Sequence, residues 1–282
     1  MPASSAPSSP PVRLRVAGGV AWATIDHPPL NLLDGALLDE LDRLGRALAG
    51  DDRVRVVVFD SADPEFFIAH ADVEGMIGRG DPQATRRERL SRFAEMTERY
   101  RTMEKVTIAL IEGRARGGGS EFALALDMRF AARETAILAQ PEVALGIPPG
   151  GGATQRLPRL AGRSRALEAI LGADDFDAET AERYGWINRA IPRAELRPFV
   201  ARLARRIASF PAPAIAHAKA AVDAAEPSLR DGLLEEHRRL RLALATPEAT
   251  AAMGAFLAAG GQTRAYERDL GANLQPDAQP ER

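Results

Sequence analysis

The first sixty residues alternate short extended segments with one amphipathic helix. Polar and apolar residues alternate over 12–17 and again over 20–25, and the two glycines between them predict the turn of a β-hairpin. Residues 35–49 carry leucines at three- and four-residue intervals, which predicts a helix with one buried stripe and with Asp34 as its N-cap. The β-branched run at 54–59 predicts a strand that is buried on both faces.

The centre of the chain continues this alternation of strands and helices. The pattern predicts, in chain order, a charged helix at 84–103, a strand at 106–111, a helix at 119–126, apolar stretches at 128–139, and helices at 153–171 and 178–185. A chain in which strands and helices alternate over this length is typical of the α/β class.

Beyond residue 192 the pattern predicts helices alone. Their ranges are 194–209, 212–224, 229–244 and 247–258, and many of them are rich in alanine and arginine. We therefore expect an α/β core at 12–191 followed by a helical C-terminal region at 192–270. Residues 1–11, rich in Ser, Pro and Ala, predict a disordered tail, and residues 271–282 predict a loose C-terminal tail.

Charge and hydropathy narrow the possible partners. The chain has 282 residues with 37 basic and 39 acidic side chains, which gives a formal net charge of −2. This balance, with no basic block, argues against nucleic acid as the main partner. No apolar run approaches the roughly 20 residues that a membrane helix needs. The N-terminal segment has neither the basic nor the apolar part of a signal peptide, so we expect a cytoplasmic protein without a membrane partner.

The residue types available narrow the possible chemistry. Cysteine is absent, which excludes disulfides, thiolate nucleophiles and zinc sites built from cysteine. The four histidines form no metal-binding pair such as HExxH, so we expect no metal site. Any chemistry must rely on carboxylates, hydroxyls and backbone groups.

The segment GRARGGGSEFALALD at 113–127 is the most informative part of the chain. A predicted strand ends before three consecutive glycines, and a predicted helix follows them. Glycines allow close approach of the backbone, and the first N–H groups of a helix lack intrahelical partners, so the segment can bind an anion. It contains neither the GxxxxGK[ST] phosphate loop nor the GxSxG nucleophile elbow. The oxyanion that develops on a carbonyl compound remains a candidate ligand.

Two glutamates lie close to glycine clusters. Glu121 is in the first turn of the predicted helix with no salt-bridge partner at helical spacing, so it either takes part in catalysis or complements the helix dipole. Glu142 follows Pro141, and this pair is a common helix start, so a structural role is its alternative. The second cluster, 150–152, predicts another helix entry. Two carboxylates beside an oxyanion-type loop favour acid–base chemistry on a carbonyl substrate.

These motifs resemble those of the crotonase superfamily, the enoyl-CoA hydratase/isomerase family. The resemblance rests on IEGRARGGGSEFALALD at 111–127, on QPEVALGIPPGGGATQRLPRL at 140–160 with its continuation through 191, and on FFIAHADVEGM at 66–76. It covers roughly residues 12–258. It implies an α/β fold that is a crotonase-type spiral of ββα units with a helical C-terminal trimerisation region, assembled as a homo-trimer or hexamer.

The resemblance also implies an activity: addition of water across a trans-2-enoyl-CoA to give a 3-hydroxyacyl-CoA. The backbone N–H groups of Ala71 and Gly118 would form the oxyanion hole for the thioester carbonyl, and Glu121 and Glu142 would be the catalytic acid–base pair. The further residues that it places at the substrate are Ala69, His70, Asp72, Gly117 and Phe256. It implies no metal or redox cofactor, because coenzyme A is part of the acyl-CoA substrate.

Several alternatives stay open at this point. His70 stands where the family usually has glycine, so it either contacts substrate or packs in the wall. Lys105 and Lys219 are the only lysines, so arginines such as Arg264 would have to bind the CoA phosphates. The apolar face of 229–244 is either a trimer contact or core. The activity could also be that of an isomerase or hydratase-lyase of the same family, or the chain could be a non-catalytic binding subunit with this fold.

Overall fold

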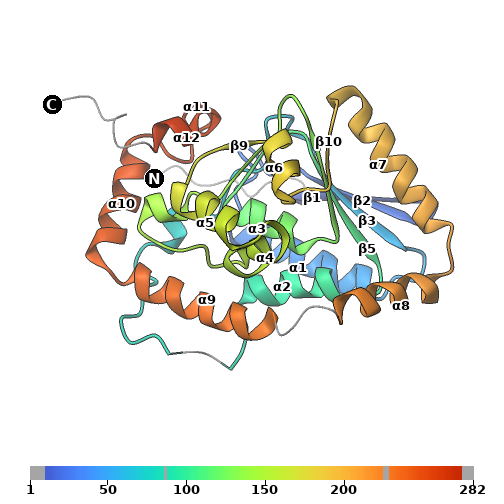
Figure 1. The fold of residues 1–282 in the computed structure, drawn as a ribbon, viewed down its shortest axis with the longest axis horizontal. Helices are drawn as coiled ribbons and strands as arrows, with labels where there is room; N and C mark the ends of the chain where they lie inside the picture. Colours follow the sequence, from blue (N-terminus) through green and yellow to red (C-terminus); the bar gives the residue numbers. More distant parts are fainter. Residues whose placement is uncertain (1–9, 86–87, 225–228, 275–282) are drawn as a thin grey trace.

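The computed structural model describes residues 10–85, 88–224 and 229–274, in which helices surround two sheets (Figure 1). The larger sheet has six strands in the order β1-β2-β3-β5-β7-β10. These are β1 Val12–Ala17, β2 Val20–Ile25, β3 Val56–Ser61, β5 Val106–Ile111, β7 Met128–Ala132 and β10 Arg189–Ile191. β1 and β2 form the predicted antiparallel hairpin, and the later neighbours in this sheet run parallel.

A smaller sheet of four strands is built from the segments that follow the strands of the larger one. Its order is β4-β6-β8-β9, with β4 Phe66–Ile68, β6 Arg114–Arg116, β8 Ile137–Ala139 and β9 Phe176–Asp177. β4 follows β3, β6 follows β5 and β8 follows β7, and helical segments come after each pair. The chain therefore repeats a β-β-helix unit, which confirms the predicted spiral of ββα units.

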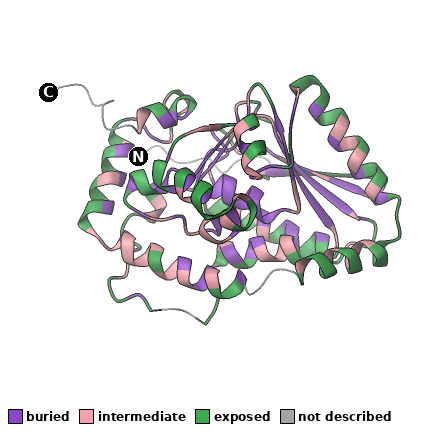
Figure 2. Cartoon of the chain, viewed as in Figure 1, coloured by how far each residue is buried: buried purple, intermediate pink, exposed green. Residues whose placement is uncertain are grey.

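The central strands of the larger sheet are apolar because both of their faces are covered. Every residue of β5 is buried, and so is β3 apart from its last residue, Ser61. α7 (Arg193–Ala208) packs against β2, β3, β5 and β7, as can be followed in Figure 1. Figure 2 shows these strands coloured as buried over most of their length.

Asp34 fixes the start of α1 (Gly35–Ala49), as the sequence predicts. Its Oδ1 accepts a hydrogen bond from the N–H of Leu37 at 2.9 Å, and its Oδ2 lies 2.8 Å from Nε2 of His27. We expect Asp34→Ala to lower the free energy of unfolding by about 1 kcal/mol, because an N–H of the first turn loses its acceptor. Urea denaturation followed by circular dichroism measures this. The exposed Asp52→Ala is the control, and an equal loss in both variants would contradict the capping role.

The helices of the central region differ in extent from two predictions. They are α2 Arg92–Thr102, α3 Gly118–Ala125, α4 Ala153–Ala161, α5 Arg163–Gly172 and α6 Ala178–Tyr184. The helix predicted at 84–103 starts only at Arg92, because Ser91 accepts from the N–H of Ala94 and acts as the N-cap. The helix predicted at 153–171 is two helices, separated at Gly162, where φ is +82°. The strand predicted at 54–59 is shifted by two residues.

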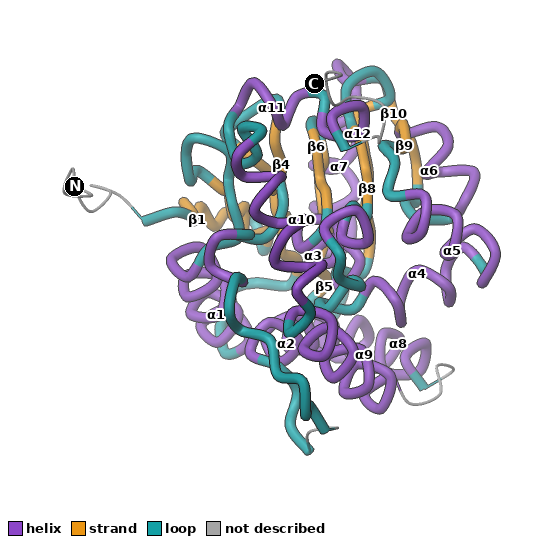
Figure 3. The backbone as a smooth tube through the Cα atoms, turned by 90° about the vertical axis from the view of Figure 1, so that its left-hand side faces the viewer, coloured by secondary structure: helices purple, strands orange, loops and turns teal. Residues whose placement is uncertain are grey.

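The C-terminal region consists of helices, as predicted. After α7 come α8 Ala212–Asp223, α9 Leu229–Leu244, α10 Pro247–Ala258 and two short helices, α11 Arg264–Arg268 and α12 Leu270–Asn273. Figure 3 shows α10, α11 and α12 together in front of the smaller sheet. Leu233 and Leu244 of α9 are buried within the chain, and Leu244 packs with α10 and α12 in a second apolar cluster. For these two side chains, the core alternative is therefore correct.

The predicted tails meet the described part of the chain at both ends. Residues 1–9 and 275–282 lie outside the described residues. The prediction of a loose tail from 271 is wrong for residues 271–274, because α12 buries Leu270 and Gly271 against the body. At the other end, Pro11 already takes part in the hairpin by accepting from the N–H of Asp26 at 2.8 Å. None of the helices in the described ranges has the length and apolar character that crossing a membrane requires.

Candidate active site

The structure brings the two predicted oxyanion-hole donors together. The chain after β4 pairs with Leu33: the Leu33 N–H donates to the carbonyl of His70 at 2.9 Å, and the Asp72 N–H donates to the carbonyl of Leu33 at 3.2 Å. This pairing does not use the N–H of Ala71. Gly118 is the first residue of α3, where N–H groups lack intrahelical acceptors, and a Cβ placed on it would lie 3.4 Å from the nitrogen of Ala71. Both donors line the same cavity.

The three glycines before α3 have different tasks. Gly117 has a φ of +47°, which favours glycine. A Cβ on Gly119 would lie less than 3.0 Å from the carbonyl oxygen of Ile68 in β4, so this glycine permits close packing of helix on strand. Gly118 instead lies next to Ala71, and both residues line the cavity.

The carboxyl of Glu121 caps a helix other than its own. Its Oε1 accepts hydrogen bonds from the N–H of Gly151 at 2.7 Å and of Ala153 at 3.1 Å, at the N-terminus of α4. The residue is 4% exposed and lines the cavity. A Cβ on Gly151 would overlap with its Oε2, so the second glycine cluster makes room for this carboxyl as well as starting α4.

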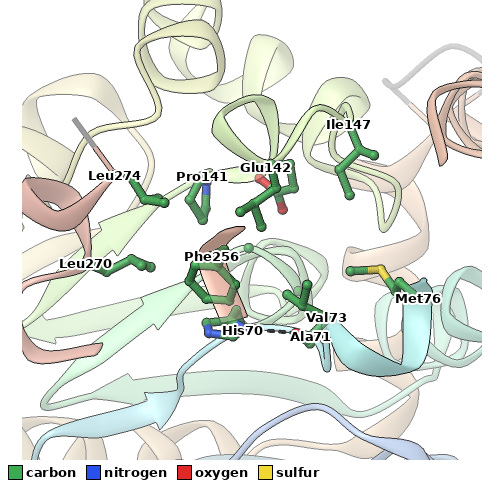
Figure 4. Close-up of a pocket in the computed structure, with 13 residues that line it drawn as sticks. His70, Ala71, Val73, Met76, Pro141, Glu142, Ile147, Phe256, Leu270 and Leu274 are labelled. Carbon is green, nitrogen blue, oxygen red and sulfur yellow. Dashed lines mark hydrogen bonds between the residues drawn. The ribbon is translucent and has the colours of Figure 1, made fainter. Parts of the chain in front are cut away.

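Glu142 approaches the same cavity from a different element. It opens the 3-10 helix η2 (Glu142–Leu145), with Pro141 in the preceding position as the sequence predicts. Figure 4 shows Glu142 and Pro141 on one side of the pocket, with His70 and Ala71 opposite. The residue is 8% exposed. Its position at a helix start and its position in the cavity are therefore compatible.

A chain of buried polar groups holds the Glu142 carboxyl from behind. In the orientation that satisfies both of its ends, the Gln140 amide donates to both carboxyl oxygens of Glu142 at 3.1 Å and accepts from Ser120 Oγ at 3.1 Å. Ser120 Oγ in turn accepts from Nε1 of Trp186 at 3.2 Å. Gln140, Ser120 and Trp186 are all fully buried, so this chain fixes the carboxyl without solvent.

Burial makes both glutamates weaker acids than usual. It raises the pKa of Glu121, although the hydrogen bonds from Ala153 and Gly151 and the charge of Arg156 oppose the rise. Burial and then the negative charge of Glu121 raise the pKa of Glu142 well above its ordinary value. Two interacting buried carboxyls do not readily ionise together. The pair therefore keeps one proton at pH values at which exposed glutamates are already ionised. Such a pair can supply one acid and one base.

A third carboxyl, which sequence analysis missed, shares the helix N-terminus that Glu121 caps. Glu236 of α9 accepts from both the N–H and the hydroxyl of Thr154. It is 4% exposed, and burial together with the charge of Glu121 raises its pKa to about 8. Arg156 partly balances this group of acids: its side chain donates to the Gly151 carbonyl and to Glu98.

We expect the stability of the protein to fall as pH rises from about 4.5 to about 8, since the folded state keeps Glu236 protonated in this range and the unfolded state ionises it near 4.5. Unfolding releases the Glu236 proton in this range, so a higher pH favours the unfolded state. The free energy of unfolding should fall by about 2 kcal/mol between pH 6 and 8. Calorimetric Tm values over this range measure the effect. Glu236→Gln should flatten the pH dependence.

The neighbouring Glu235 provides the matched control for this experiment. It pairs with Arg238 and Arg239, which hold its pKa at about 2, so Glu235→Gln should leave the slope between pH 6 and 8 unchanged. Equal slopes in the wild type and in Glu236→Gln would show that Glu236 does not titrate in this range.

Two pockets meet at the site, and Ala71, Gly118 and Glu142 line both of them. A volume of about 300 Å³ lies on the side of Glu121, with an apolar wall that includes Leu33, Leu38, Phe93, Ile147 and Leu240. His237 and Arg92 also line this part. A smaller volume of about 30 Å³ lies on the other side, between His70, Phe256, Leu270 and Leu274 (Figure 4). A substrate whose carbonyl is held at the two N–H groups has room on both sides of that carbonyl, in the larger and in the smaller pocket.

The remaining predicted substrate residues are placed differently. Gly117, His70 and Phe256 line the smaller volume. Ala69 packs against Leu30 and Phe66 in a small apolar cluster instead. Asp72 accepts from Nε2 of Gln262 at 3.0 Å, and neither Ala69 nor Asp72 lines the described cavity.

Arg264 is engaged elsewhere on the surface. Its guanidinium pairs with Asp63 and Glu65 and donates to the carbonyl of Pro29. These partners raise its pKa and satisfy its donors, so Arg264 is not poised for a phosphate. Within the described ranges, no three His, Asp or Glu side chains converge as a metal ion would require.

Some of the missed residues carried a signal in the sequence. Glu236 occupies an apolar stripe at helical spacing, between Leu233 and Leu240, where a carboxylate is out of place on a buried face. Gln140 follows an apolar stretch and stands two residues before Glu142. A polar side chain at the end of a buried stretch needs a hydrogen-bond partner, and the Glu142 carboxyl is close in the chain. His237 carried no such signal.

Most of the chain is similar to known proteins. Residues 15–257 match the enoyl-CoA hydratase/isomerase family. The "Probable enoyl-CoA hydratase" of Rhizobium meliloti is 35% identical over 86% of this chain and 92% of its own, and the "Crotonyl-CoA hydratase" of Syntrophomonas wolfei is 34% identical over 81% and 87%. A crystal structure of an enoyl-CoA hydratase homologue from Streptomyces avermitilis superposes with a TM-score of 0.86 at 44% identity, over 94% of this chain and 97% of that one. This chain, with its crotonase-type fold, belongs to the enoyl-CoA hydratase/isomerase family.

Proposed function

We propose that the protein is an enoyl-CoA hydratase that adds water across a trans-2-enoyl-CoA to give a 3-hydroxyacyl-CoA. The observation that carries this proposal is the pair of buried carboxyls, Glu121 and Glu142, beside two backbone N–H groups that can hold one oxygen. Water addition needs a base for the water and an acid for C2, and the cavity supplies both. Names of relatives such as the crotonyl-CoA hydratase support the same reaction.

The thioester carbonyl binds to the N–H groups of Ala71 and Gly118. As water attacks C3, negative charge moves onto this oxygen and forms an enolate, which the two donors stabilise. An enolate is stabilised more than the neutral thioester, so this contact lowers the barrier rather than only tightening binding.

The environments of the two glutamates support a division of roles. Glu121 receives hydrogen bonds from the N–H groups of Gly151 and Ala153, which favour its ionised form, so it takes a proton from water. Glu142 has the more strongly raised pKa, so it holds the proton that passes to C2 of the enolate. The proton gained by Glu121 returns to Glu142 through water after product leaves. The reaction needs no metal or redox cofactor.

We further propose that the chain assembles as a trimer or a pair of trimers. α8 supports this because none of its residues is buried within the chain, and Val222 on it is 72% exposed (Figure 2). Light scattering coupled to size-exclusion chromatography tests the assembly. A monomer at micromolar concentration would contradict it.

The experiment that tests the reaction is incubation with crotonyl-CoA, with the loss of enoyl absorbance followed and the product identified by mass. We expect a gain of one water, with the oxygen of H₂¹⁸O found in the product. A shift of the double bond without a mass change would assign isomerisation instead. Conversion of a longer enoyl-CoA into a shorter acyl-CoA would assign a lyase. Absence of binding would indicate a non-catalytic subunit.

A further inference from the structure

The ring of His70 lies between two hydrogen-bond acceptors next to the oxyanion hole. Its Nδ1 is 2.8 Å from the carbonyl oxygen of Ala71, and its Nε2 is 3.0 Å from Oε1 of Glu267 in α11. The residue is 5% exposed, and Figure 4 shows the ring in the pocket floor beside Phe256. A carbonyl oxygen only accepts hydrogen bonds, so Nδ1 must carry a proton.

The charge of Glu267 decides the state of the other ring nitrogen. Glu267 is fully buried, and its Oε1 also accepts from the N–H of Gln262 at 2.8 Å. Burial opposes ionisation, yet His70, the Gln262 N–H and Arg116 together hold the pKa of Glu267 below its ordinary value. Nε2 of His70 lies 3.0 Å from this carboxylate, and a proton on Nε2 would turn the contact into a charge-paired one.

We propose that His70 is a buried imidazolium that positions the first oxyanion donor and adds positive charge beside the developing enolate. Nδ1–H holds the carbonyl of Ala71, and the Leu33 N–H holds the carbonyl of His70, so the peptide that carries the Ala71 N–H is fixed on both sides. This assignment deepens the proposed function and rests on it for the identity of the reaction. His70 acts through Ala71 and is a positioning residue.

The C-terminal segment holds the partner of His70 in place. The carbonyl of Glu267 accepts from Nη1 of Arg116 at 2.5 Å, and Arg116 makes a two-point contact with Asp175. Gln262, in the turn before α11, donates a hydrogen bond from Nε2 to Asp72, the residue that follows Ala71. The orientation of the imidazolium therefore depends on contacts from β6, α11 and the turn before α11.

Other titratable groups face His70 from the elements around it. Glu142 of η2 lies on the far side of Gly117, where a Cβ would be 3.5 Å from the Cβ of His70 and 3.0 Å from Oε1 of Glu142. Asp72 follows His70 by two residues and is paired with Gln262, Arg116 acts on Glu267, and Tyr266 packs edge-on against Phe256. Positive charge at His70 lies close enough to the Glu142 side of the site to act on the enolate.

The charge state is measured directly by ¹⁵N NMR of the histidine rings in the full chain. The sequence has only four histidines, so His70→Gln assigns the signal. We expect both ring nitrogens of His70 to be protonated at pH 7.5 in the wild type, and only one of them in Glu267→Gln. A ring protonated on Nδ1 alone at pH 7.5 would overturn the proposal.

The effect on the enolate is measured with two ligands that need no turnover. Acetoacetyl-CoA ionises to an enolate, whereas butanoyl-CoA is a neutral saturated thioester. We expect His70→Gln to weaken binding of the enolate about tenfold and to leave butanoyl-CoA within about twofold, a smaller loss than removal of a direct donor causes. Glu267→Gln, which keeps the ring in place, should act in the same direction. The exposed His217→Gln is the control.

These measurements separate the role of His70 from the identity of the reaction. Equal weakening of both ligands, or of neither, in His70→Gln would overturn the proposal, because a purely structural residue does not distinguish an enolate from a neutral thioester. If crotonyl-CoA is not hydrated but the enolate is still selected by His70, the proposed reaction fails and the positioning role stands. If hydration occurs, His70→Gln should lower kcat about tenfold with KM unchanged.

Discussion

Glu142→Gln is expected to lower kcat for the hydration of crotonyl-CoA by about 10³-fold, with KM changed by less than about threefold. Glutamine keeps the shape of the side chain and its place beside Gln140, but it cannot deliver a proton to C2. The substrate still binds through the cavity wall and the two N–H groups, so the loss appears in kcat.

Comparison with Glu121→Gln makes this prediction sharper. In the proposed mechanism Glu121 holds the water, so Glu121→Gln should abolish hydration to a similar degree but leave exchange of a C2 proton of butanoyl-CoA with D₂O. Glu142→Gln should abolish both. The exposed Glu248→Gln is the matched control and should behave like the wild type in both assays. Retention of hydration in either active-site variant would refute the acid–base assignment.

Gly119→Ala is expected to reduce the free energy of unfolding by about 3 kcal/mol and kcat by about 10²-fold, in the fraction that folds. A Cβ there would lie less than 3.0 Å from the carbonyl oxygen of Ile68 and 2.8 Å from its Cβ. Neither the strand nor the helix can relax cheaply, so α3 must move away from β4. That movement carries Gly118 away from Ala71 and widens the gap between the two donors.

Gly254→Ala is the control for this substitution. Gly254 lies within α10, and a Cβ there would have no atom within 4 Å. Alanine is favoured over glycine inside a helix, so Gly254→Ala should raise the free energy of unfolding by about 0.5–1 kcal/mol and leave kcat unchanged. Chemical denaturation and the crotonyl-CoA assay measure both quantities. Full activity and stability of Gly119→Ala would contradict the close contact.

Local patterns predicted the elements whose signals lie within a few neighbouring residues. The hairpin at 12–25 and α1 with its Asp34 cap follow from alternation, turn glycines and leucine spacing, and the structure confirms them. The break at Gly162 was missed because apolar spacing continues across it from α4 to α5. Strands β4, β6 and β9 have only two or three residues and exist through pairing with distant segments, which no local pattern contains.

The site was predictable only as far as its motifs are local. The glycines before α3 and the position of Glu121 in its first turn indicated an anion site, but nothing near Glu121 indicated that it would cap α4. The same limit applies to Glu236, whose neighbours in the site come from other helices. The partner of His70, Glu267, lies in the predicted helical C-terminal region but beyond its last predicted helix, which ends at 258.

The contacts that hold the last helices on the body join residues far apart in the chain. Arg264 reaches Asp63 across 201 positions, and Arg116 reaches the carbonyl of Glu267 across 151. Contacts of such separation require closure of long loops and form late in folding. A chain growing from the ribosome can build its larger sheet early, but the wall with Phe256 and Leu270 can close only when synthesis has passed these residues. A nascent chain should therefore remain inactive until residue 270 has been synthesised.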